Sequence, residues 1–144
     1  MKPGDSFCVF PSGPANWNFH DNTITGCTSP VVLDSYGSET SLLKGNLITR
    51  GEATGVKAAV EVGGLFKLIG NQISGFDEKD SSALSLAADA LGRVARSIYR
   101  DNIFERCIAV VPKDQAALWD AAKPEGNVFV ECGERKDPNP APSP

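Results

Sequence analysis

Apolar and polar residues alternate with a period of two in four short segments, and each segment surrounds an asparagine. The four asparagines are Asn22, Asn46, Asn71 and Asn102, and their positions differ by 24, 25 and 31. Alternation of this kind is typical of strands that bury one face. The predicted inward side chains are Phe19, Leu43, Leu68 and Tyr99 before the asparagines, and Ile24, Ile48, Ile73 and Phe104 after them. The pattern therefore predicts a repeat in which two short strands meet at the asparagine.

The residue before each asparagine is always Gly or Asp: Asp21, Gly45, Gly70 and Asp101. Both residue types tolerate left-handed and bridge backbone conformations, which a sharp bend between strands requires. Backbone groups buried at such a bend need partners, and stacked asparagine amides can supply them. We therefore interpret the asparagines as an internal structural ladder, with a ligand-binding column as the alternative. A second apolar strand is predicted after each bend, at Val31–Leu33, Ala59–Val62, Ala83–Leu86 and Ile108–Val111.

The repeat has a period in the mid-20s. At each bend its sequence is Gly or Asp, then Asn, then any residue, then typically Ile. This pattern resembles the right-handed parallel β-helix of the pectin lyase-like superfamily. The resemblance covers roughly residues 16–133. It implies an all-β fold, a short right-handed parallel β-helix (a solenoid of about four to five coils). We expect an N-terminal cap strand (Phe7–Phe10) and turn within residues 1–15, and a proline-rich linker or tail over residues 134–144. A short helix within residues 114–123 is expected to cap the C-terminal end.

The segment Ser81–Ile98 fits two interpretations. Leu84, Leu91 and Ile98 fall on one face of a helix if the whole segment is helical. Alternatively, its first residues align with the second strand of the preceding repeat and its end aligns with the next bend. We favour the repeat, which leaves Ala88–Val94 as an inserted turn or loop.

The four cysteines are Cys8, Cys27, Cys107 and Cys132, and no two of them form a CxxC pair that would indicate zinc. Cys27 and Cys107 each follow an asparagine by five residues, three coils apart. Three strand spacings make about 14 Å, whereas a disulfide needs α-carbons within about 7 Å. We expect no bond between these two, nor between Cys8 and Cys132 near opposite chain ends, and we interpret all four as free buried thiols.

Composition limits the classes of binding partner that the sequence predicts. The net charge of −4 provides no general attraction to nucleic acid, and no apolar run approaches the length of a membrane span. We therefore expect neither nucleic-acid binding nor a membrane span. The N-terminal residues lack the apolar core of a signal peptide, and the proline-rich tail is typical of a linker. These features favour an excised domain and leave its compartment unassigned.

The resemblance implies a function among those of the superfamily, whose members are largely polysaccharide lyases, glycoside hydrolases and carbohydrate-associated modules. Lyases of this type bind calcium through a cluster of aspartates, and the hydrolases pair carboxylates on neighbouring coils. The outward column of the second strands here is Val32, Glu61, Ser85 and Ala109, with one carboxylate. We therefore assign no catalytic residue, no metal and no cofactor, with calcium relevant only under the lyase alternative.

The candidate ligand-binding residues are basic or aromatic. His20, Lys44 and Arg100 lie two residues before the asparagines, and Arg50 and Arg106 lie four residues after them. Such a basic strip could bind a sugar carboxylate or sulfate, and Trp119 on the capping helix is the candidate for an exposed aromatic that stacks on sugar rings. The alternative is an ordinary solvated edge on which cations discourage strand pairing.

These features predict a non-catalytic module of a larger protein that binds carbohydrate (an acidic polysaccharide included) or a protein partner on its lateral face. The first alternative is a fragment or divergent member of a polysaccharide lyase or glycoside hydrolase. The second is a purely structural domain. Because a short solenoid has open ends, a homodimer through one end is a further expectation.

Overall fold

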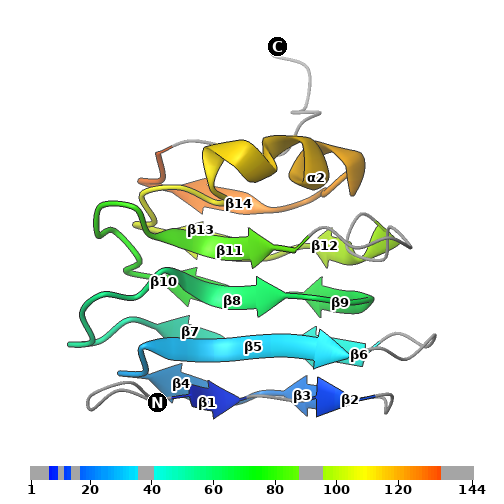
Figure 1. The fold of residues 1–144 in the computed structure, drawn as a ribbon, viewed down its shortest axis with the longest axis horizontal. Coiled ribbons are helices and arrows are strands. Elements are labelled where there is room, and N and C mark those ends of the chain that lie inside the picture. Colours follow the sequence, from blue (N-terminus) through cyan, green and yellow to red (C-terminus); the bar gives the residue numbers. More distant parts are fainter. Residues whose placement is uncertain (1–6, 10–11, 14–16, 36–40, 88–95, 134–144) are drawn as a thin grey trace.

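The computed structural model describes residues 7–9, 12–13, 17–35, 41–87 and 96–133, which form a parallel β-solenoid of about four turns (Figure 1). Sheet I contains β1 (Phe7–Val9), β2 (Ser12–Gly13), β5 (Ser29–Ser35), β8 (Ala58–Val62) and β11 (Ser82–Leu86). Sheet II contains β3 (Asn18–His20), β6 (Ser41–Lys44), β9 (Phe66–Ile69) and β12 (Ile98–Arg100). Sheet III contains β4 (Thr23–Thr25), β7 (Leu47–Thr49), β10 (Gln72–Ser74), β13 (Ile103–Glu105) and β14 (Val128–Val130). All strand pairs are parallel, so each coil rests on the one before it, as the sequence predicts.

The bend between sheets II and III follows the predicted local chemistry. Asp21, Gly45, Gly70 and Asp101 have φ values of 59°, 66°, 66° and 58°. These are left-handed conformations, which Gly adopts without cost and Asp tolerates better than most residues. The bend is therefore encoded by the residue type in front of each asparagine.

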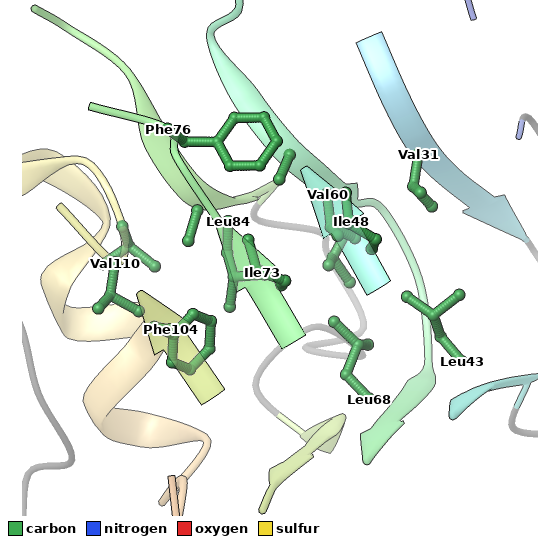
Figure 2. Packing of buried hydrophobic residues seen from close by; sticks show 14 of the residues in the cluster. Val31, Leu43, Ile48, Val60, Leu68, Ile73, Phe76, Leu84, Phe104 and Val110 are labelled. Atoms are coloured by element: carbon green, nitrogen blue, oxygen red, sulfur yellow. The ribbon is translucent and has the colours of Figure 1, made fainter. Parts of the chain in front are cut away.

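The core is a stack of apolar side chains from all three sheets (Figure 2). The register pairs Leu43 with Leu68 and Ile48 with Ile73. The predicted inward residues Leu43, Ile48, Leu68, Ile73, Tyr99 and Phe104 are each no more than 1% exposed. Burial of each such side chain contributes about 1.5–3 kcal/mol, and in a solenoid each contribution depends on the neighbouring coil.

Hydrogen bonds connect the asparagines from coil to coil. Asn46 donates from its backbone N–H and from Nδ2 to Asn71 Oδ1, at 3.0 and 3.1 Å. Asn46 Nδ2 also donates to the carbonyl of Phe19 at 3.0 Å. The same pattern joins Asn22 to Asn46, Asn71 to Asn102 and Asn102 to Asn127. The column thus includes a fifth member that the sequence analysis missed.

The missed fifth bend was visible in the sequence. Gly126 precedes Asn127 and has a φ of 68°, and Phe129 lies two residues after the asparagine. β14 pairs with β13 in the register of the earlier coils, with Phe104 opposite Phe129. The intervening helix concealed the repeat, because its residues do not alternate with a period of two.

A short helical segment of nine residues lies near the C-terminus, as predicted. A 3-10 turn, η1 (Lys113–Gln115), leads into α2 (Ala116–Ala121), which lies over the last coils at the end of the stack (Figure 1). The side chain of Gln115 ties it to sheet I, since its Oε1 accepts a hydrogen bond from the Leu86 backbone N–H at 2.6 Å. The helix therefore covers the end of sheet I, which agrees with the predicted capping role.

Two predicted segments differ in outcome. The ends of Ser81–Ile98 are strands, as the repeat interpretation requires, while residues 88–95 lie outside the described part of the chain. Ile108–Val111 is not a strand, contrary to prediction. Its carbonyls still accept hydrogen bonds from β11, with Ala83 N–H donating to Ala109 and Leu84 N–H to Val110. Adjacent N–H groups of β11 thus donate to adjacent carbonyls, whereas a paired strand directs alternate residues to one neighbour, so the segment does not pair as a strand.

The cysteines are partly as predicted. Cys107 and Cys132 are free thiols, and Cys27 and Cys107 are not bonded to each other. Cys27, however, is disulfide-bonded, so the prediction of a free thiol there is wrong. Repeat spacing relates Cys27 only to its equivalent position in another coil. The N-terminal strand β1 lies outside that spacing, and it pairs with β5 directly after Cys27.

Candidate binding face

The outer face of sheet II carries a basic side chain on every strand. Its outward residues form two columns, which are Asn18, Leu42, Lys67 and Ile98, and His20, Lys44, Ile69 and Arg100. The four basic residues are His20 on β3, Lys44 on β6, Lys67 on β9 and Arg100 on β12, and all are exposed. Neighbouring parallel strands lie about 4.8 Å apart, so the face presents one basic group per strand, with Lys67 in one column and the other three in the second column. We call these four residues the basic row.

The two ends of the basic row have acidic neighbours. His20 Nδ1 lies 3.1 Å from Asp21 Oδ2, and Arg100 Nε lies 3.3 Å from Asp101 Oδ2. These pairs are exposed, and such pairs contribute at most about 1 kcal/mol, so a ligand can compete for them. His20 adds positive charge only when it is protonated.

The centre of the row is not neutralised. Lys44 and Lys67 form no ion pair with any other residue that the structure describes. They lie on adjacent strands and in adjacent columns, because Leu42 is opposite Lys67 and Lys44 is opposite Ile69. Two ammonium groups are therefore available to an anionic ligand.

Apolar groups lie between the cations. Leu42 and Ile69 are half-buried, and the side chain of Ile98 is 38% exposed. Together with the lysine stems, they place apolar area between the charged groups. The face thus combines charge for anions with apolar area.

Lys67 was not among the residues predicted from sequence. The period-two alternation of Phe66–Ile69 places Phe66 and Leu68 inward and Lys67 outward, so the signal was present. The basic residues predicted from sequence lie two residues before or four residues after an asparagine. Lys67 lies four residues before Asn71 and was therefore overlooked.

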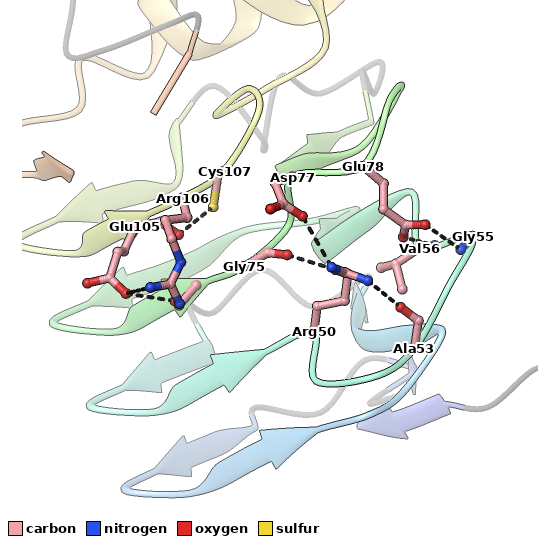
Figure 3. A network of polar contacts seen from close by, with 11 residues as sticks. Arg50, Ala53, Gly55, Val56, Gly75, Asp77, Glu78, Glu105, Arg106 and Cys107 are labelled. Carbon is pink, nitrogen blue, oxygen red and sulfur yellow. Dashed lines mark hydrogen bonds and ion pairs between the residues drawn. The ribbon is translucent and has the colours of Figure 1, made fainter. Parts of the chain in front are cut away.

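The structure places Arg50 elsewhere, at the corner that follows sheet III (Figure 3). Its guanidinium donates from Nε to the carbonyl of Gly75 at 2.8 Å and from Nη1 to the carbonyl of Ala53 at 2.9 Å. Its Nη2 lies 3.2 Å from Asp77 Oδ1. Arg50 therefore holds two loops together and has little capacity left for a ligand.

Arg106 also lies at this corner and is more exposed. Its Nη1 lies 3.4 Å from Glu105 Oε1, and its Nη2 donates to Ser74 Oγ at 3.3 Å. With Arg50 and Asp77, it lines a hollow of about 330 Å³. Because one carboxylate accompanies each arginine, this hollow has little net attraction for an anion.

Trp119 is buried, contrary to the expectation that it is exposed. It has no exposed surface, and its ring centroid lies 5.4 Å from that of Tyr99 and 6.3 Å from that of Phe104. The indole therefore fixes α2 on the last coils and cannot stack on a sugar from solvent. Aromatic pairs of this geometry add about 0.5–1.5 kcal/mol beyond burial.

Glu61 is the one ionisable residue in the outward column of sheet I. Its carboxyl lines a hollow of about 250 Å³ together with Ser85 and Gly63. Partial burial raises its pKa, and the nearby charge of Lys57 opposes that rise. Within the described ranges, no group of three or more His, Cys, Asp or Glu could hold a metal ion. Glu61 thus lacks the described partners that a carboxylate pair or a calcium cluster requires.

Comparison with protein-family models, curated proteins and solved structures finds none that matches this chain. Among the described residues, no helix is both long enough and apolar enough to span a bilayer. The geometry of the chain itself is therefore the basis for assigning a function.

Proposed function

We propose that this domain is a non-catalytic binding module that binds an acidic polysaccharide along the outer face of sheet II. The observation that carries the proposal is the basic row, one cationic or protonatable side chain per strand on a chain whose net charge is −4. A polysaccharide of uronic acid or sulfated units presents negative charges at regular intervals along an extended chain. It can therefore contact several members of the row at once.

The expected affinity is low. A pair of opposite charges about 4 Å apart contributes about 1 kcal/mol in water. Four such contacts give at most about 4 kcal/mol, because His20 and Arg100 have acidic neighbours, so the Kd of a single engagement should be no lower than about 1 mM. Long chains bind more tightly through repeated engagement. Salt screens exposed charges over about 10 Å at 0.1 M and about 3 Å at 1 M, so binding should weaken strongly between these concentrations.

Affinity electrophoresis suits this range, because it detects weak binding to a polymer in the gel. The probes are polygalacturonate and dextran sulfate, with neutral dextran as the uncharged control. We expect retardation by the two polyanions and not by dextran. Lys44→Ala with Lys67→Ala removes about 2 kcal/mol and should weaken binding about 30-fold.

The control variant carries the same charge change on another side of the molecule. Lys57→Ala with Lys79→Ala also removes two exposed lysines, and these lie outside the basic row. We expect this variant to retain most of the retardation. Equal losses in the two variants would show that binding follows net charge alone and would contradict the proposed face.

The same samples separate the alternatives. New reducing or unsaturated sugar ends in the polysaccharide would identify an enzyme and contradict a non-catalytic module. Retardation by neither polyanion would remove the polysaccharide proposal and favour a protein partner or a structural role. A homodimer through a solenoid end would appear as a doubled mass in sedimentation equilibrium, and it is compatible with the proposed face.

A further inference from the structure

Cys107 and Cys132 occupy the same repeat position in the last two coils. Each follows its asparagine, Asn102 or Asn127, by five residues. β13 and β14 pair in register up to Glu105 opposite Val130. The ladder continues beyond the strands, since Arg106 N–H donates to the Val130 carbonyl at 2.8 Å and Gly133 N–H donates to the Cys107 carbonyl at 3.1 Å. The two cysteines are therefore lateral neighbours.

The two thiols also have the same orientation. Cys107 Sγ donates to the carbonyl of Ile73 at 3.7 Å, and Cys132 Sγ donates to the carbonyl of Phe104 at 3.0 Å. Ile73 and Phe104 are equivalent residues in consecutive coils. Each thiol therefore points toward the coil before its own, and Cys132 Sγ points toward the coil that contains Cys107. The Cys132 side chain is also close enough to contribute to the raised pKa of the Cys107 thiol.

This spacing suits a covalent bond. Adjacent strands hold paired α-carbons about 4.8 Å apart, and disulfides span α-carbon distances of about 4.4–6.8 Å. Cys27 and Cys107 are three coils apart, whereas Cys107 and Cys132 are one coil apart. The Cys27 disulfide shows that this fold accommodates such bonds.

We propose that Cys107 and Cys132 are a latent disulfide site that closes when the folded protein meets a low-molecular-weight disulfide such as oxidised glutathione. The Cys132 thiolate attacks one glutathione sulfur, which forms a mixed disulfide and releases one reduced glutathione. The Cys107 thiolate then attacks the Cys132 sulfur and releases the second glutathione. Two protein thiols are oxidised, one oxidised glutathione is reduced to two thiols, and the thiol protons go to solvent and to the leaving thiolates.

The order of the steps follows from access. Cys132 is half-buried, whereas Cys107 is 1% exposed, so the oxidant meets Cys132 first. Burial, with a further contribution from Cys132, raises the pKa of the Cys107 thiol to about 12. Burial, the larger cause, persists after Cys132 has reacted, so the second step is slow at neutral pH and its rate should rise with pH, because the thiolate is the nucleophile.

The bond would attach the final coil to the one before it. It encloses residues 108–131, which include α2, Trp119 and β14. Cross-linking a loop of this length restricts the unfolded chain, and we expect the Tm to rise by about 5–10 °C. This inference is independent of the polysaccharide proposal, because neither cysteine lies on the sheet II face.

The test incubates the folded full chain with oxidised glutathione at several pH values, then alkylates the remaining thiols under denaturing conditions and measures intact mass. We expect both thiols of the wild type to disappear with no glutathione retained. Tryptic digestion should then give peptide 107–113 linked to peptide 114–135. The thermal midpoint should rise in the oxidised wild type and should not rise in Cys132→Ser.

Cys107→Ser is the matched variant. It retains Cys132 without the second thiol, so it should accumulate a stable glutathione adduct. An adduct that persists in the wild type at high pH, or two thiols that remain fully alkylatable, would overturn the proposal. A link between Cys132 and a cysteine other than Cys107 in the peptide map would do so as well.

Discussion

The asparagine column gives the sharpest stability prediction, and Asn71 at its centre is the residue to change. The Asn71 side chain is 1% exposed and makes four hydrogen bonds. Its Oδ1 accepts from Asn46 N–H and Asn46 Nδ2, and its Nδ2 donates to the Leu43 carbonyl and to Asn102 Oδ1. Asn71→Ala removes all four.

The magnitude follows from these contacts. Each hydrogen bond contributes about 0.5–1.5 kcal/mol net, and a buried donor left without a partner costs about 1–3 kcal/mol. Asn46 Nδ2 retains the Phe19 carbonyl, and Asn102 Oδ1 still accepts from the Asn71 backbone N–H. The buried Asn46 N–H loses its acceptor. We expect a loss of about 4 kcal/mol, a large part of the 5–15 kcal/mol that stabilises a typical domain.

Asn22 supplies the matched control, because it lies at the first bend and is exposed. Within the described part of the chain, its side chain makes one hydrogen bond, from Nδ2 to Asn46 Oδ1 at 3.1 Å. Asn22→Ala should therefore cost about 1 kcal/mol. Urea unfolding followed by far-ultraviolet circular dichroism gives both values, provided that the two variants share the wild-type slope. Equal losses, or a loss below about 1 kcal/mol for Asn71→Ala, would refute the structural role of the column.

Two further predictions concern a tight turn and a partly buried carboxyl. Gly51 and Gly55 have φ values of 60° and 73°. A Cβ added at Gly51 would lie 2.7 Å from Thr25 Oγ1 and 3.3 Å from Gly26 N, whereas a Cβ added at Gly55 would make no such contact. Both alanine variants should lose about 1–2 kcal/mol for the left-handed backbone, and Gly51→Ala should lose more in urea unfolding; an equal loss would show that the contact relaxes freely. The pKa of Glu61 is raised by burial, so its ionised form destabilises the folded state as pH rises through that pKa. Glu61→Gln should therefore stabilise the protein at pH 7 and lose this advantage at pH values well below the ordinary pKa of 4.5, and a Tm difference that does not change with pH would contradict the sign.

Local sequence chemistry determined the coil. Period-two alternation around each asparagine is sufficient to predict the paired strands of sheets II and III, because the side-chain direction in a strand depends only on position. Gly or Asp before each asparagine predicts the left-handed bend, since that conformation is a property of single residues. The repeated interval then predicts parallel stacking, because each coil can bury its apolar face only against another coil.

Only the tertiary structure decided which polar side chains are available. Arg50 and Lys44 are both basic residues beside an asparagine, yet Arg50 is held by carbonyls of two loops and Lys44 is exposed. Trp119 looked like a surface aromatic until α2 was placed on Tyr99 and Phe104. In each case the partner comes from another coil or from a loop of irregular length. Periodicity along the chain specifies which face a residue occupies, but contacts across coils depend on register and loop path, which no local pattern encodes.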